Sequence, residues 1–349
     1  MAYQNPGTPR FYISIFQWLH SLGVLESASS NYTDQMSGKP EYELIEINPT
    51  KPFIFTTGGN VNWSTTQIYA LGYKIKTGYG SFSDYMPMEN NFSMILGHTL
   101  KDSIHDIRNW GGQYETLAHT PLVNGDNPME KNGFSIRTGN DGHNLDSTIA
   151  FRLAGYYGQT EYKMGSWLYG TYFDISHSPT LGLKINVDMD GVNMKRSKSG
   201  SDLNNYNYTK SPAWDNNAPW NIGGSDYEMS RIGRRSWDLQ FSYLSDVNLS
   251  GVNHSIANNT PLYNIEGYNT DYYNTVDNTY YDNISKDNSF FSQVIMKTNG
   301  GQLPFVFQPD NTNNNPDSFA ICKFDQNSFD FKQVASGVYD ISLKIREIW

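Results

Sequence analysis

The sequence predicts a mainly β protein, and its composition and its alternating apolar segments support this class. Aromatic residues make up 15% of the 349 residues, with 25 Tyr and 30 Gly, whereas charged residues make up only 17%. Such a mixture favours strands joined by polar turns over amphipathic helices, because aromatic side chains pack well on pleated surfaces. Several short segments alternate apolar and polar residues, which is the pattern of a strand with one buried face.

The segment 1–57 contains the first predicted elements. Residues 9–22 form an apolar stretch that fits either a strand or a short helix, and its periodicity leaves both open. Residues 41–47 and 53–55 are predicted to be strands, since both are rich in apolar residues and an Asn-Pro turn signal lies between them. We therefore expect this segment to form the first part of a sheet domain.

The segment 58–190 is predicted to contain many short strands joined by turns rich in Gly and Asn. Strands are expected at 93–100, 147–153 and 181–189. Because a sandwich of such strands closes a core of its own, we expect an inserted β-sandwich here. The segment 191–232 has few consecutive apolar positions and is expected to be a linker or arm. In the strand at 181–189 the apolar face comprises Leu181, Leu183, Ile185, Val187 and Met189.

The segment 233–349 contains the clearest strands of the chain. Alternation predicts strands at 233–244 and 337–349, and a further strand at 303–307. A short helix is expected over 290–297, because a serine that can cap it precedes it and glycines follow it. The inward positions of the two long strands are Trp237, Leu239, Phe241 and Tyr243 in the first and Tyr339, Ile341, Leu343 and Ile345 in the second.

The composition excludes several classes of function. A formal net charge of −10 argues against a duplex-binding surface, which needs clustered Lys and Arg, so we expect no sequence-specific binding to nucleic acid. Cys322 is the only cysteine and lies in an apolar alternation, so we expect a packed thiol and synthesis in a reducing cytoplasm. No apolar run approaches the roughly 20 residues of a membrane-spanning helix, so we expect no membrane insertion.

The sequence contains no motif of a nucleotide-binding protein, a zinc protease or a serine hydrolase, so we expect neither enzymatic activity nor a cofactor. Glu161, Asp174, Asp188 and Glu228 could supply the carboxylate pair of a glycan depolymerase, but nothing in the sequence selects two of them. Structural calcium is the one metal considered, with solvated turns as the alternative. The candidate calcium ligands are Asp141, Asp146, Asp188 and Asp190.

Aromatic side chains are the candidates for sugar binding, because exposed rings stack on sugar faces while neighbouring polar groups bind the hydroxyls. The alternative for each ring is a position in the core. The candidate glycan contacts are Trp63, Tyr79, Trp110, Tyr114 and Trp167.

Arginines cluster around the two long C-terminal strands. Because arginine pairs bidentately with carboxylates across subunit boundaries, we expect this cluster at a subunit interface, with a solvated strand end as the alternative. The strand at 337–349 is expected to lie at an open edge of its sheet, where a neighbouring subunit can pack. The predicted interface residues are Arg231, Arg234, Arg235, Arg346 and Trp349.

Three blocks in the last third of the chain resemble the closing segment of a family of tailed-phage proteins. They read RRSWDLQFSYL at 234–244, PFVFQPD at 304–310 and GVYDISLKIREIW at 337–349, with the short predicted helix after the first. In order and content they are similar to segments of distal-tail and tail-tip proteins, the structural proteins of the baseplate ring. Upstream, SMILGHTL at 93–100 resembles a strand and turn of galactose-binding-like jelly rolls.

These resemblances imply a helix-flanked, tail-tube-like β-sandwich domain interrupted by an inserted jelly-roll β-sandwich. The tube-like domain is expected to combine 1–57 with 233–349, and the jelly roll to occupy 58–190, before a linker or arm at 191–232. The implied function is that of a structural component of the phage tail tip. Copies would form a homo-oligomeric ring, with a hexamer as one candidate, that connects the tail tube to the host-adsorption apparatus.

The same resemblance implies partners and a location. The expected partners are other phage tail proteins, namely the tail tube, the hub and the fibres, and the expected location is the virion tail, assembled in the cytoplasm of the host bacterium. A carbohydrate-binding adhesion module that recognises host surface glycans is the alternative, and a glycan depolymerase is a further rival. The ring symmetry and the host receptor stay open.

Overall fold

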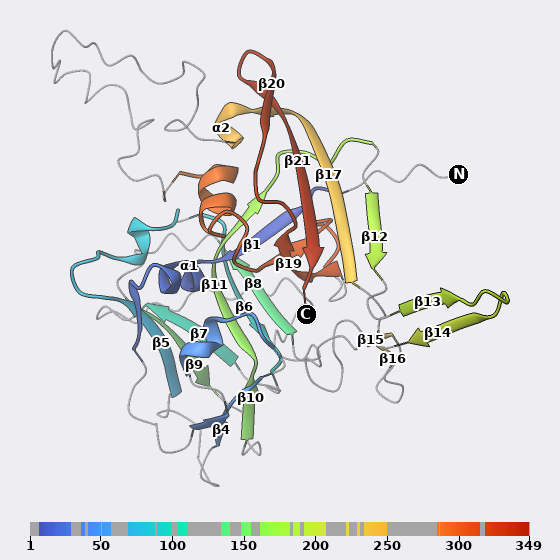
Figure 1. Ribbon diagram of the computed structural model, residues 1–349. Coiled ribbons are helices and arrows are strands. Elements are labelled where there is room, and N and C mark those ends of the chain that lie inside the picture. The colour runs from blue at the N-terminus through green and yellow to red at the C-terminus, as the bar shows by residue number, and fades with distance from the viewer. Residues whose placement is uncertain are drawn as a thin grey trace.

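The computed structural model is mainly β, as the sequence predicts, and Figure 1 shows its strands gathered around one large sheet. The structure describes residues 7–28, 36–38, 41–49, 51–56, 69–87, 89–98, 104–109, 134–139, 148–154, 161–181, 184–188, 192–206, 221–222, 229–230, 234–249, 285, 287–314 and 318–348.

The large sheet is ten-stranded and antiparallel. Its strands follow the order β12-β17-β21-β19-β18-β1-β11-β6-β8, and β20 pairs with β21 beside this path. Their bounds are β1 Arg10–Ser14, β6 Asn91–Leu96, β8 Phe134–Gly139, β11 Ser166–Asp174, β12 Lys184–Asp188, β17 Arg234–Ser245, β18 Phe305–Gln308, β19 Ala320–Phe324, β20 Phe331–Ala335 and β21 Val338–Glu347.

The remaining described strands form smaller sheets. A four-stranded sheet has the order β2-β5-β9-β7, a three-stranded sheet has the order β10-β4-β3, and β13-β14 and β15-β16 are separate pairs. Their bounds are β2 Leu25–Ser27, β3 Met36–Gly38, β4 Phe53–Thr56, β5 Tyr69–Ile75, β7 Ile104–Asn109, β9 Thr148–Ala154, β10 Glu161–Met164, β13 Val192–Arg196, β14 Asp202–Tyr206, β15 Asn221–Ile222 and β16 Met229–Ser230. The helices are α1 Ile15–Ser21, α2 Asp246–Leu249, the 3₁₀ helices η2 Glu41–Ile45 and η3 Phe82–Asp84, and the π-helix η5 Phe291–Met296.

The junction between β1 and α1 explains why the stretch 9–22 fits both a strand and a helix. The chain leaves β1 at Ser14 and enters the helix at the next residue. It passes so close to β11 that a Cβ atom on Gly170 would lie 2.0 Å from the carbonyl oxygen of Ile13. Only glycine fits at this position of β11, because any side chain would collide with the backbone of β1 where the strand gives way to α1.

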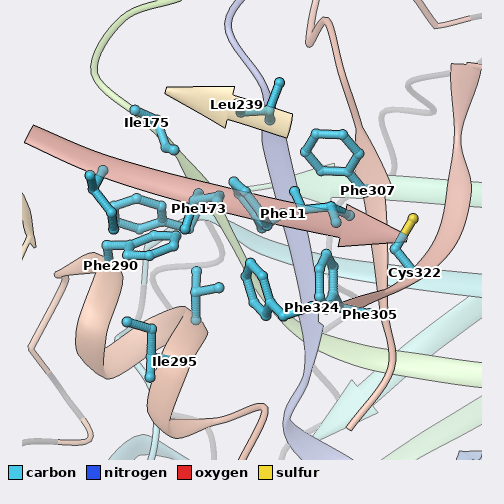
Figure 2. Packing of buried hydrophobic residues seen from close by; sticks show 14 of the residues in the cluster. Phe11, Phe173, Ile175, Leu239, Phe290, Ile295, Phe305, Phe307, Cys322 and Phe324 are labelled. Carbon is cyan, nitrogen blue, oxygen red and sulfur yellow. The ribbon is translucent and has the colours of Figure 1, made fainter. Parts of the chain in front are cut away.

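Aromatic side chains fill the core between the large sheet and its helices. Where α1 packs on β11, the rings of Phe16 and Trp167 lie 5.0 Å apart. A second cluster joins η5 to the C-terminal strands, and Figure 2 shows Phe290 and Ile295 facing the side chains of those strands. Phe11 of β1 contacts four rings of this cluster, with centroids 5.2–6.1 Å away: Phe290, Phe305, Phe307 and Phe324.

Most predicted strands are present, but two details were predicted wrongly. Residues 41–45 form the 3₁₀ helix η2 instead of a strand, and the neighbours Leu44 and Ile45 are both buried in it. Tyr243 was expected to point inward but is 79% exposed. Its φ of 62° accompanies a register shift in β17 after Phe241, which turns Leu244 inward in its place.

The strand expected at 181–189 exists as β12, but its environment differs from the prediction. It pairs with β17 at the end of the large sheet, and no other described strand pairs with it. Of the side chains expected to be inward, Leu181, Ile185 and Val187 are 69%, 57% and 56% exposed; Leu183 and Met189 lie outside the described residues. Ile185 lies opposite the buried Trp237, so the apolar face of the sheet continues onto β12 without being covered there.

The expected boundary near residue 57 does not separate two sheets. β1 pairs with β18, so the segments 1–57 and 233–349 do share a sheet, as expected. However, β6, β8 and β11 from the segment 58–190 belong to that same sheet, and β11 pairs with β1 along five residues. β2 and β4 also pair with the strands β5 and β10 from 58–190, and β3 pairs with β4. The described strands of 58–190 therefore do not form a separate jelly roll.

The segment 191–232 was expected to be a linker or arm. Its described part contains the hairpin β13–β14, which projects away from the large sheet in Figure 1. We call this hairpin, residues 192–206, the arm.

Candidate functional site

Arg235 was predicted to face a neighbouring subunit, but its guanidinium is bound within the chain. Its Nε and Nη2 atoms donate to the two carboxylate oxygens of Glu347 over 3.1 and 3.0 Å, and Nη2 also donates to the carbonyl oxygen of Phe319 over 3.2 Å. The guanidinium lies 5.3 Å from the ring centre of Trp237. The side chains of Arg235 and Glu347 are only 17% and 3% exposed. This ion pair therefore ties β17 to β21 within one chain.

The last strand was predicted to lie at an open edge, and this prediction is wrong. β21 pairs with β17 on one side and with β19 and β20 on the other. The carboxylate of Glu347 also accepts a 2.8 Å hydrogen bond from the backbone N–H of Arg235. A neighbouring subunit cannot add a strand where both sides of β21 are already paired.

The other predicted interface residues divide into two groups. The Nε atom of Arg346 lies 3.7 Å from Oδ2 of Asp188, and both side chains are more than one-third exposed. Arg234 is half-buried at the start of β17, opposite Asp188 in the strand register. Arg231 and Trp349 lie outside the described residues.

Two of the five candidate glycan contacts can be placed. Trp167 is fully buried on β11, packs against Phe16 and donates its indole N–H to Ser93 Oγ over 3.2 Å, so it is a core residue and not a sugar contact. Tyr79 is 55% exposed and lies between Gly78 and Gly80, whose φ angles are positive. Its backbone carbonyl accepts a hydrogen bond from the hydroxyl of Tyr85 over 2.7 Å, which fixes the loop that presents the ring. Trp63, Trp110 and Tyr114 lie outside the described residues.

Two of the acidic side chains proposed for a depolymerase or for calcium binding lie beside arginines. Asp174 accepts both hydrogen bonds of the Arg10 fork, over 2.6 and 2.7 Å, and Asp188 lies beside Arg346. Within the described part of the chain, no group of three or more His, Cys, Asp or Glu side chains could hold a metal ion. The calcium candidates Asp141, Asp146 and Asp190 lie outside the described residues, as does Glu228.

A buried polar network around η5 was not anticipated from the sequence. The amide nitrogen of Gln293 donates to the backbone carbonyl oxygens of Ser285 and Asp287, and its amide oxygen accepts hydrogen bonds from Thr171 of β11 and from Lys297. Burial lowers the pKa of Lys297 well below its usual value, and the nearby carboxylate of Asp287 raises it in part. Polar residues of a short helix usually form its solvated face, so nothing in the sequence indicated this network. All of these side chains are buried, and the network anchors η5 to the sheet.

Cys322 is a packed thiol, as expected. It is fully buried in β19, and burial raises its pKa well above the usual value, with Glu347 adding to this effect. An uncharged, buried thiol is chemically inert.

The described part of the chain thus contains ion pairs and hydrogen-bond networks that hold its own elements together, and one exposed apolar sheet edge. Comparison with known proteins gave no matching family model, no matching curated protein and no matching solved structure. None of the described helices is long and apolar enough to span a membrane.

Proposed function

We propose that this chain is a structural component of a phage tail tip, where copies of it form a ring that joins the tail tube to the host-adsorption apparatus. The observation that carries the proposal is the set of blocks at 234–244, 304–310 and 337–349, which are similar in order and content to the closing segment of distal-tail proteins. Its partners would be the tail tube, the hub and the fibres, and its place the virion tail.

The arrangement of these blocks in space supports the proposal. They supply the strands β17, β18 and β21, which with β19 are four adjacent strands of the large sheet. Val294 and Ile295 of the helix η5 are buried in the same hydrophobic cluster as the apolar side chains of these four strands. A packed sheet with a flanking helix is the arrangement that the resemblance to tail-tube-like domains implies.

Electron microscopy of the purified protein tests this proposal most directly. Rings with a fixed number of subunits, accompanied by a matching mass in light scattering, are the expected result. A protein that stays monomeric up to about 100 µM, well above the micromolar range of moderate association, would contradict the proposed ring.

Glycan binding is the second candidate function, and the presentation of Tyr79 favours it. An exposed ring held on a fixed loop is suited to stack on a sugar face. We expect Tyr79→Ala to remove binding on an array of bacterial surface glycans, whereas the control Tyr42→Ala, which changes a tyrosine of similar exposure (56%), leaves it unchanged. Equal binding by both variants, or no binding by the unmodified protein, would contradict this function.

A further inference from the structure

We infer that the edge strand β12 and the arm that follows it form the surface through which a second copy of this chain binds. The inference rests on the proposed ring for the identity of the partner. It places the contact on residues other than the arginine cluster.

The first observation is the open edge that β12 forms at one end of the large sheet. Among the described strands, β12 has a single neighbour, β17, whereas β21 is paired on both sides. Ile185 lies opposite Trp237 and Val187 lies opposite Arg235 in the β12–β17 pairing, yet both Ile185 and Val187 remain more than half exposed. An exposed strand edge with an apolar face is a template for another chain, and proteins that leave it uncovered tend to aggregate.

The second observation is the arm. Three residues separate the end of β12 from Val192, so the arm starts within about 14 Å of the open edge. Met194 and Leu203 are 77% and 62% exposed, and they lie on opposite faces of the hairpin, since Met194 is opposite Asn204 and Lys195 is opposite Leu203. An isolated two-stranded hairpin is marginally stable in water, so a hairpin with apolar side chains on both exposed faces is expected to pack on a partner.

Charge identifies that partner as a second copy. The arm has three basic residues, Lys195, Arg196 and Lys198, and one acidic residue, Asp202, and therefore carries a net charge of +2. The chain carries −10 in total, so the rest of it carries −12. A basic arm beside an apolar edge is complementary to the acidic body of another copy. Such a contact joins two different surfaces, and repeated contacts of this kind form a ring when the rotation between neighbouring copies closes.

The experiment measures the mass of purified variants by light scattering as a function of concentration. We expect Ile185→Glu with Val187→Glu to weaken self-association by on the order of 100-fold, since each places a charge in the apolar contact. Lys195→Glu with Lys198→Glu should weaken it to a similar degree. The matched controls are Val334→Glu, which alters an exposed apolar residue of β20, and Lys332→Glu with Lys344→Glu, which makes the same charge change on the body. Circular dichroism of each variant checks that the subunit remains folded.

The outcomes separate this inference from the proposed ring. Loss of association in the β12 and arm variants, with the controls unchanged, supports the surface, even if the assembly is a dimer and the ring itself is contradicted. Rings that persist in all variants overturn the surface and leave the ring standing. A monomeric unmodified protein overturns both.

A cross-linking experiment identifies the partner independently. Carbodiimide joins lysines to carboxylates in direct contact, and a mixture of isotopically light and heavy protein reveals which joined peptides come from different copies. Mixed-isotope pairs between Lys195 or Lys198 and carboxylates of the body are expected. If the arm variants instead lose binding to vesicles of phosphatidylcholine and phosphatidylglycerol while their mass stays that of the unmodified assembly, the arm binds lipid and the inference is wrong.

Discussion

Replacing Arg235 with alanine should destabilise the subunit itself, because this residue supplies most of the hydrogen bonds to a buried carboxylate. Without the guanidinium, the 3% exposed carboxylate of Glu347 keeps the 2.8 Å hydrogen bond from the backbone N–H of residue 235 and loses both side-chain hydrogen bonds. The carbonyl oxygen of Phe319 also loses its donor. Removing one partner of a buried ion pair costs about 3–5 kcal/mol, since the other charge stays buried without compensation.

Arg346 provides a matched control on the neighbouring strand. Arg346 also carries a guanidinium beside a carboxylate, but its Nε atom lies 3.7 Å from Oδ2 of Asp188. The side chains of Arg346 and Asp188 are 39% and 46% exposed. Exposed pairs of this kind contribute about 0–1 kcal/mol, so Arg346→Ala should have a small effect. The double variant Arg235→Met with Glu347→Leu should recover most of the lost stability, because it removes both charges and fills the space with apolar groups.

Urea unfolding, followed by circular dichroism and by tryptophan fluorescence, measures these differences. The fluorescence is informative because the Arg235 guanidinium lies 5.3 Å from the Trp237 ring. The expected order of stability is unmodified protein, Arg346→Ala, the double variant, and then Arg235→Ala well below the others. Arg235→Ala and Arg346→Ala within about 1 kcal/mol of each other would refute the reasoning.

Three further predictions follow from buried groups and from strand pairing. Burial lowers the pKa of His98 to about 3, so the unfolded chain binds a proton first as the pH falls; the free energy of unfolding should drop by about 2 kcal/mol between pH 7.5 and pH 5, and His98→Gln, but not the exposed His20→Gln, should remove this drop. Burial also lowers the pKa of Lys297, so stability should rise with pH until about 10.5, and Lys297→Met should abolish this slope and stabilise the protein at neutral pH by about 1–2 kcal/mol; a retained slope would contradict this. Residues 60–190 expressed alone should not form a folded monomer, because β11 would lose β1 and Trp167 would lose Phe16; a cooperative unfolding transition of that fragment would show the opposite.

The sequence was sufficient to predict where many strands lie and which of their side chains are apolar. The alternation in β21 and in the first part of β17 predicts their buried positions correctly, because one face of each strand packs on the core. The same reasoning failed at Tyr243, because a register shift in β17 reverses the alternation there. The local sequence does not indicate this shift.

It was harder to predict from the sequence which strands pair with each other and which charged side chains form ion pairs. The alternation in a strand is the same whether its neighbour comes from its own segment or from a distant one, so the pairing of β11 with β1 could not be inferred from either sequence alone. Arg235 was predicted to pair with a carboxylate across a subunit boundary, whereas its carboxylate partner, Glu347, belongs to the same chain and lies 112 positions away in the sequence.

The contrast between β12 and β21 shows what an amphipathic strand does and does not determine. Both have an apolar face, and in both that face belongs to the same side of one continuous sheet, as the rows through β17 show. In β21 the face is covered by the helix and strands of the second cluster, and Ile341, Leu343 and Ile345 are at most 2% exposed. In β12, Ile185 and Val187 remain exposed at the end of the sheet, beside a basic arm. The alternation in β12 favours burial of Ile185 and Val187, but the described chain leaves these side chains exposed. A second molecule that packs on β12 would bury them. We therefore place the partner surface at β12 and not at the C-terminal strand.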